Sequence, residues 1–127
     1  MTAVIGRWTC LVIDCPDPRA LASFYEELLG LGRTEDSPAW VTLGELKSAP
    51  RVAFQRITNF TAPEWSVVGV PQQMHLDVVV ENLDDAERSV LALGAFLLDG
   101  SDKPIGYRVY ADPIGHPFCL VTPEALS

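Results

Sequence analysis

The stretch "QQMHLDVVV", residues 72–80, holds a histidine and an aspartate two residues apart, a pair that could do acid–base chemistry. An imidazole changes its charge near neutral pH, and a carboxylate can orient its ring, raise its pKa or act as a general base itself. Side chains alternate between the two faces of a strand, so His75 and Asp77 share one face. They are the candidate catalytic residues. The alternative is that His75 is a half-buried, hydrogen-bonded residue without a catalytic role.

Three further side chains fall on the corresponding face of other predicted strands. In "RVAFQRIT" and "GHPFCLVT" the phenylalanines belong to the packing face, which leaves Gln55 and Cys119 on the opposite side. In "CLVIDC", alternation puts Cys10 and Asp14 on that side. The bland alternatives are that both cysteines are small core residues and that Asp14 is a turn former at the end of its strand.

Aromatic side chains suggest a different kind of site. Trp40, Trp65 and Tyr107 could form a stacking wall for a flat ligand, and Arg108 could attract an anionic group on that ligand. The same aromatic residues could instead complete a core or a dimer interface. His116, the second histidine, lies in "DPIGHP" and is expected to be a solvated turn residue.

An internal repeat organises these residues along the chain. "CLVIDCPDPRALASFYEELLGLG" resembles "HLDVVVENLDDAERSVLALGA" at a shift of 65 residues, which matches His75 with Cys10. Downstream, Phe54 matches Phe118 and Gln55 matches Cys119 at a shift of 64 residues. Each half therefore predicts a strand, a helix and three shorter strands.

Local signals place these elements. Asp17 followed by Pro18 predicts the start of the first helix, and Gly30 predicts its end; Asn82 predicts the start of a second helix over 83–93. Strands are expected at 9–15, 33–35, 40–43, 52–57, 74–80, 96–98, 107–111 and 118–121. We expect one domain over 1–127, with a first module at about 8–58, a linker at 59–71 and a second module at about 72–123.

Composition narrows the class of protein. A chain of 127 residues with 48% hydrophobic and 20% charged residues is typical of one soluble globular domain. Its net charge of -8 and the absence of basic runs argue against nucleic acid and anionic membranes as partners. No apolar run approaches the ~20 residues of a membrane span, no signal peptide is recognisable, and the three cysteines lack CxxC spacing. We expect a cytoplasmic protein.

Taken together, the motifs "DPRALASFYEELLGLG", "MHLDVVVENLDDAERSVLALGA" and "VYADPIGHPFCLV" resemble the vicinal oxygen chelate superfamily over nearly the whole chain. That superfamily includes glyoxalase I, extradiol dioxygenases and bleomycin-resistance proteins. The chain is most similar to small glyoxalase-like proteins of actinobacteria. The resemblance implies an α+β fold of two βαβββ modules whose strands form a cupped mixed sheet, usually in a homodimer.

The resemblance also implies four metal-ligand positions, which fall here on Cys10, Gln55, His75 and Cys119. His75 and Gln55 match the family's ligand types, whereas the two cysteines depart from them. Because the carboxylate expected on the last strand is missing, typical glyoxalase I and extradiol dioxygenase activities are not expected. The remaining donors would favour zinc, although glutamine is a poor zinc ligand and an apolar site raises the pKa of a thiol.

Two functions fit these observations, and a third has no feature that selects it. The first is a glyoxalase-like protein acting on or binding a small organic molecule in the cup of the sheet, as a metal-assisted lyase or isomerase. The second is a non-catalytic protein that sequesters an antibiotic or aromatic metabolite, as bleomycin-resistance proteins do. The third is a regulatory or interaction domain. Fold alone does not choose among them.

Overall fold

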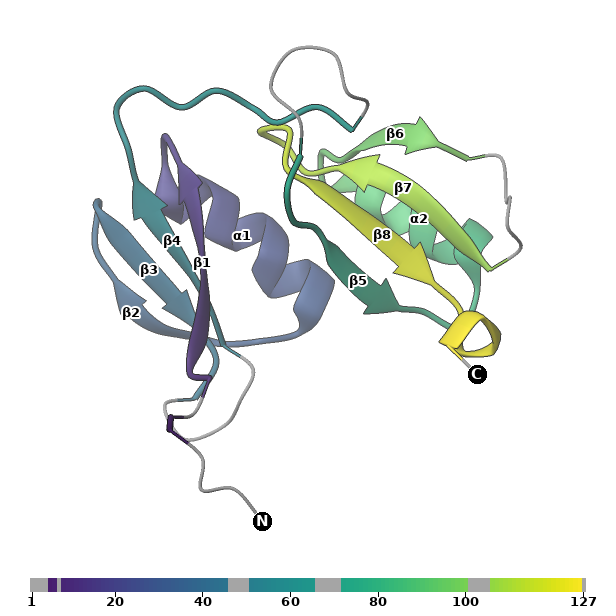
Figure 1. Cartoon of the computed structure of the whole chain (residues 1–127), viewed down its shortest axis with the longest axis horizontal. Coiled ribbons are helices and arrows are strands. Elements are labelled where there is room, and N and C mark those ends of the chain that lie inside the picture. Colours follow the sequence, from purple (N-terminus) through teal and green to yellow (C-terminus); the bar gives the residue numbers. More distant parts are fainter. Residues whose placement is uncertain (1–4, 7, 46–50, 66–71, 101–105, 127) are drawn as a thin grey trace. The chain divides into compact units, whose positions relative to one another are not determined.

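The computed structural model describes residues 5–6, 8–45, 51–65, 72–100 and 106–126 (Figure 1). The chain divides into two compact units, Met1–Phe60 and Thr61–Ser127, and each unit has the order strand, helix, three strands. The predicted α+β fold of two βαβββ modules is confirmed. Part of the predicted linker, residues 66–71, lies outside the described residues.

The first unit is a four-stranded sheet with one helix. Its elements are β1 (Cys10–Cys15), α1 (Pro18–Leu29), β2 (Arg33–Asp36), β3 (Trp40–Leu43) and β4 (Arg51–Arg56). The strand order is β1-β4-β3-β2, in which β1 and β4 are parallel and the other pairs are antiparallel.

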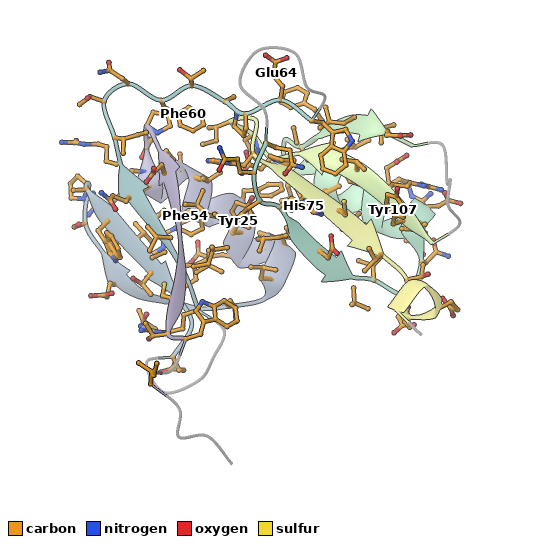
Figure 2. The ribbon with its side chains drawn as sticks, in the orientation of Figure 1. Tyr25, Phe54, Phe60, Glu64, His75 and Tyr107 are labelled. Atoms are coloured by element: carbon orange, nitrogen blue, oxygen red, sulfur yellow. The ribbon has the colours of Figure 1, made fainter. Side chains whose placement is uncertain are left out.

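Helix α1 begins and ends where the sequence predicts. The carboxylate of Asp17 accepts a hydrogen bond from the Ala20 amide at 3.3 Å, and Gly30 ends the helix in the left-handed region with φ 68°. One apolar face of α1 is buried against the sheet. Figure 2 shows Tyr25 and Phe54, whose ring centroids lie 5.4 Å apart in this core.

The second unit repeats the plan. Its elements are β5 (Leu76–Val79), α2 (Leu83–Ala92), β6 (Phe96–Asp99), β7 (Tyr107–Ala111) and β8 (Pro117–Val121), followed by a short 3₁₀ helix at Pro123–Leu126. The strand order is β5-β8-β7-β6, again with one parallel pair, β5 with β8. Asn82 caps α2 by accepting a hydrogen bond from the Asp85 amide at 2.9 Å.

Strand β8 is buried on both of its faces. On the α2 side, the rings of Tyr110 and Phe118 stack with centroids 5.5 Å apart, and the Tyr110 hydroxyl donates to Glu87 of α2 at 2.8 Å. On the other side a second apolar cluster forms, which consists of Val109, Cys119 and Val121 with Tyr107 packed against them. A residue of β8 that faces away from α2 is therefore still shielded from water.

Strand pairing corrects the repeat at one point. Phe54 lies opposite Ile13, whereas its counterpart Phe118 lies opposite Leu76, so the strand pairs superpose at a shift of 63 residues. The second unit has two more residues than the first between this strand position and the helix cap. The structural counterpart of His75 is therefore Val12, and not Cys10 as the repeat predicts. An even shift keeps every side chain on its predicted face.

Candidate functional site

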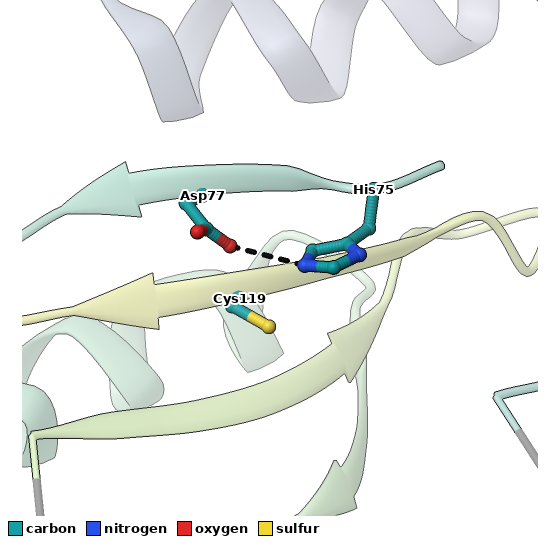
Figure 3. Close-up of side chains that lie close together, drawn as sticks. All are labelled: His75, Asp77 and Cys119. Carbon is teal, nitrogen blue, oxygen red and sulfur yellow. Dashed lines mark ion pairs between the residues drawn. The ribbon is translucent and has the colours of Figure 1, made fainter. Parts of the chain in front are cut away.

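His75 lies one residue before β5 begins, so it precedes the strand on which the sequence placed it. Its Nε2 atom is 3.3 Å from a carboxylate oxygen of Asp77 (Figure 3), and the two side chains are 33% and 54% exposed. The predicted pair is thus formed, and both members are open to solvent. An imidazole held by a carboxylate can take up or release a proton toward a ligand on its exposed side.

Cys119 joins this pair from the neighbouring strand. It lies directly opposite Asp77 in the parallel pair of β5 and β8, and its residue is 3% exposed. The ligating atoms of His75, Asp77 and Cys119 all lie within 4.8 Å of one another (Figure 3). Within the described residues this is the group of histidine, cysteine and acidic side chains that could hold a metal ion.

The Cys119 thiol is held in its protonated form. Burial, followed by the negative charge of Asp77 and a hydrogen bond with that carboxylate, raises the pKa of Cys119 to about 11. At neutral pH the sulfur is therefore a thiol and not a nucleophilic thiolate. Proton transfer at this site falls to His75 and Asp77.

Trp65 forms an aromatic wall beside the imidazole. Its ring lies 5.3 Å from the His75 ring, centroid to centroid, and the two planes meet at 73° in an edge-on contact. The segment that carries it is tied to the start of the second module, because the Glu64 carbonyl accepts a hydrogen bond from the Gln72 amide at 2.9 Å. Sequence reasoning named Trp65 and His75 separately, and no local signal in the sequence connects them.

The remaining predicted residues of the second unit lie on opposite faces of the sheet. Tyr107 packs against the cluster that contains Cys119. Arg108, the next residue along β7, points to α2 and binds Asp84 at 2.8 Å and Glu87 at 3.3 Å, with its side chain 11% exposed. The structure therefore places the Arg108 guanidinium on the face away from His75, where it anchors the helix.

In the first unit, Gln55 has different neighbours from those expected. It lies between Asp14 of β1 and Trp40 of β3, opposite both in the sheet. Cys10 lies opposite Arg51, four residues before Gln55, a separation of about 13 Å along the strand. The structure does not bring Cys10 and Gln55 together. Of the four predicted metal positions, it brings together His75 and Cys119, and Asp77 joins them.

Cys10 and Trp40 have local partners. Cys10 is half-buried, and burial raises the pKa of its thiol. The Trp40 indole N–H donates to the Thr42 hydroxyl at 2.8 Å, and that hydroxyl donates to Glu35 at 2.6 Å. Trp40 also lines an open hollow of about 480 Å³ with Glu35, Asp36 and Ser37. The predicted aromatic contact in this unit thus lies beside acidic groups.

Comparison with known proteins fits this arrangement of two modules. The profile of the glyoxalase-like domain family matches residues 10–121, which is most of the chain. The chain belongs to this family. Solved structures of glyoxalase/bleomycin resistance/dioxygenase proteins share its fold, so the predicted membership of the vicinal oxygen chelate superfamily is confirmed. No curated protein matched the sequence.

Three of the similar solved structures show how far this likeness extends. A glyoxalase-related enzyme from Fulvimarina pelagi has a TM-score of 0.70 at 18% identity, over 94% of this chain and 90% of its own. A family enzyme from Burkholderia phytofirmans has a TM-score of 0.69 at 18% identity, over 90% and 96%. TnmS3, an antibiotic-binding protein from Streptomyces, has a TM-score of 0.60 at 16% identity, over 96% and 99%. At these identities the likeness shows the fold alone.

The described helices of this family member were also compared with membrane spans. Within that part of the chain, none is long and apolar enough to cross a bilayer.

Proposed function

We propose that this protein binds a small organic molecule beside His75. His75 and Asp77 contact the polar groups of the ligand, and Trp65 and Tyr107 contact its flat apolar part. The observation that carries this proposal is convergence: the donor atoms of His75, Asp77 and Cys119 lie within 4.8 Å of one another, and the Trp65 ring lies 5.3 Å from the imidazole. A few convergent polar groups beside aromatic surface are typical of small-molecule sites.

Binding without catalysis is the simpler form of this function. The solved structures that share the fold include an antibiotic-binding protein, and an aromatic metabolite or antibiotic has the flat shape that Trp65 can contact. Membership of the family supports small-molecule binding in general. In this form the polar pair orients the ligand and no bond is broken.

The test is a thermal-shift screen of flat aromatic compounds against the wild type, His75→Ala and His116→Ala. A compound that binds the folded protein raises its melting temperature by mass action. We expect compounds that stabilise the wild type and His116→Ala but no longer stabilise His75→Ala. Equal stabilisation of both variants would place the ligand elsewhere, and the absence of any stabilising compound would contradict the proposal.

Zinc bound by His75, Asp77 and Cys119 is a second candidate function of the same site. In the structure, Nε2 and the carboxylate oxygen are 3.3 Å apart, which matches the separation of about 3.4 Å between two ligands in a tetrahedral zinc site. Nitrogen, oxygen and sulfur donors suit zinc, and three protein ligands leave one position open. The donor set fits the ion, with the carboxylate coming from Asp77 on β5 and not from the last strand.

Bound zinc would polarise an oxygen atom of the ligand, which is the chemistry that a lyase or isomerase of the glyoxalase type needs. In that form of the function, His75 and Asp77 would hold the metal and Tyr107 and Trp65 would orient the ligand. Metal analysis and calorimetric titration with Zn²⁺ test the proposal. We expect binding by the wild type and His116→Ala, and loss of binding in His75→Ala and Cys119→Ala. A wild type that takes up no zinc contradicts this candidate and leaves the binding function intact.

The first unit supplies a further part of the proposal. Trp40 and Gln55, opposite each other in the sheet, remain predicted ligand contacts together with Arg108 and Cys10. A homodimer and a cytoplasmic location are proposed from the family resemblance. Analytical ultracentrifugation tests the first, since a monomer at micromolar concentration would contradict it.

A further inference from the structure

The tight turn between β7 and β8 lies against the segment that carries Trp65. Gly115, in this turn, has φ +106°, and a Cβ atom built on it would lie 2.6 Å from the Cβ of Ala62. Two carbon atoms do not approach so closely, so any side chain at this position would push Ala62 away. The Ala62 backbone, at 3.9 Å from the same point, would have to move with it.

The turn itself resists displacement. Asp112 is fully buried, and its carboxylate accepts hydrogen bonds from the amides of Ile114 and His116, both at 3.0 Å. Backbone hydrogen bonds close the turn in both directions: the Gly115 amide donates to the Asp112 carbonyl at 2.9 Å, and the Asp112 amide donates to the His116 carbonyl at 2.8 Å. A clash at Gly115 is therefore expected to displace the segment 61–65 more than the turn.

That segment leads directly to the candidate site. Trp65 follows Ala62 by three residues, and the hydrogen bond from the Gln72 amide to the Glu64 carbonyl, 2.9 Å long, fixes the backbone between them. The Trp65 ring then meets the His75 ring at 5.3 Å. Gly115 is thus connected to His75 through two packing contacts and one short stretch of chain.

We propose that Gly115 is a positioning residue of the site: its missing side chain lets Ala62 seat on the turn, which holds the Trp65 indole beside His75. Gly115 touches no ligand and acts through Trp65. The inference deepens the proposed function, because it assigns what sets the aromatic wall of that site. Its test uses the protein without ligand, so either idea can fail while the other stands.

Proton NMR of the imidazole rings gives the readout. The chain has two histidines, so each ring proton gives two signals, which His116→Asn assigns. An indole beside an imidazole displaces the imidazole signals through its ring current, and Trp65→Ala measures the full size of that displacement. We expect Gly115→Ala to move the His75 signals in the direction of Trp65→Ala by at least half as much.

Gly94→Ala is the matched control. Gly94 has φ +107°, so alanine there carries the same backbone strain, but the nearest atom, on Pro113, is at 3.5 Å, an ordinary contact. We expect the His75 signals of this variant to stay at their wild-type positions. A displacement as large as that of Gly115→Ala would overturn the proposal, because strain alone would then explain the effect.

Two further variants separate the contact from the fold. Ala62→Gly removes the atom that a side chain at 115 would meet, so the double variant Ala62→Gly/Gly115→Ala is expected to return the His75 signals toward wild type. Ala62→Val adds two methyl groups on the other side of the contact and leaves the glycine unchanged, which keeps the test available if Gly115→Ala fails to fold. His75 signals that stay at wild-type positions in Ala62→Val, or that the double variant fails to restore, overturn the proposal.

Discussion

Asp77 lies directly opposite Cys119 in the parallel pair of β5 and β8, and its carboxylate is also 3.3 Å from the imidazole of His75. One carboxylate thus contacts both an exposed base and a buried thiol. Its negative charge and hydrogen bond, together with burial, hold the pKa of Cys119 at about 11. Asp77 is therefore the residue through which protonation, metal binding and ligand contact at this site are coupled.

The raised pKa of Cys119 predicts a specific loss of stability at alkaline pH. The pKa in the folded protein is about 11 and the ordinary value is 9.0. Below pH 8 both states keep the proton and the thiol adds no pH dependence. As the pH rises from 9 toward 11, the unfolded thiol ionises while the folded one stays protonated, so unfolding is favoured. Between pH 8 and 10 this costs about 1 kcal/mol of the free energy of unfolding.

Urea denaturation of the wild type and Cys119→Ala over this pH range measures the effect as a difference. The control is Cys15→Ala, which removes a buried thiol that does not lie beside Asp77. We also expect Asp77→Asn to lower the pKa of Cys119 relative to the wild type, since the charge of Asp77 raises it, and so to shrink the alkaline loss. Identical alkaline slopes for the wild type and Cys119→Ala would count against the assignment.

Zinc binding, if it uses the thiolate, must release the proton of Cys119. Because the pKa of this thiol is about 11, we expect the affinity for Zn²⁺ to rise about tenfold for each unit of pH between 7 and 9. Calorimetry in buffers of different ionisation enthalpy measures the released proton directly. Cys119→Ala is expected to remove both the proton release and this part of the pH dependence. An affinity that does not change with pH would exclude Cys119 as a ligand.

Glu87 is predicted to anchor α2 to its sheet. Its carboxylate accepts from the fully buried Tyr110 hydroxyl at 2.8 Å and from Arg108 at 3.3 Å. Glu87→Ala leaves the hydroxyl without this acceptor, and we expect a loss of about 1–3 kcal/mol in the free energy of unfolding. Asp85→Ala, on the same helix, removes an exposed ion pair with Arg88 and should cost about 0.5 kcal/mol or less. Equal losses in the two variants would show that Glu87 has no special role.

Local chemistry explains why the order of elements could be predicted from the sequence. Asp17, Pro18 and Gly30 mark the two ends of α1 through backbone groups a few residues away, and the structure confirms both ends. Alternation of apolar residues likewise assigns Phe54 and Phe118 to the packing faces, where both are fully buried. These signals depend on nearest neighbours, which the sequence states directly.

The composition of the site could be predicted only in part, because it depends on contacts between distant residues. The repeat matches Cys10 with His75, but the two extra residues before the cap of α2 change the strand register, which no local signal reveals. Arg108 illustrates the same limit: its neighbour Tyr107 faces the Cys119 cluster, and so Arg108 faces the acidic side chains of α2. The contact of Trp65 with His75 joins a linker to a strand and leaves no pattern in the sequence.

Fluorescence titration of single-tryptophan proteins tests the central claim, a ligand site beside His75, most directly. The chain has three tryptophans, so Trp8→Phe/Trp40→Phe leaves the indole that contacts His75, and Trp8→Phe/Trp65→Phe leaves the one in the first unit. Each protein is titrated with a compound that stabilises the wild type. We predict a saturable change in the emission of Trp65 that His75→Ala abolishes. A saturable change that is confined to Trp40, or one that persists in His75→Ala, would contradict the account.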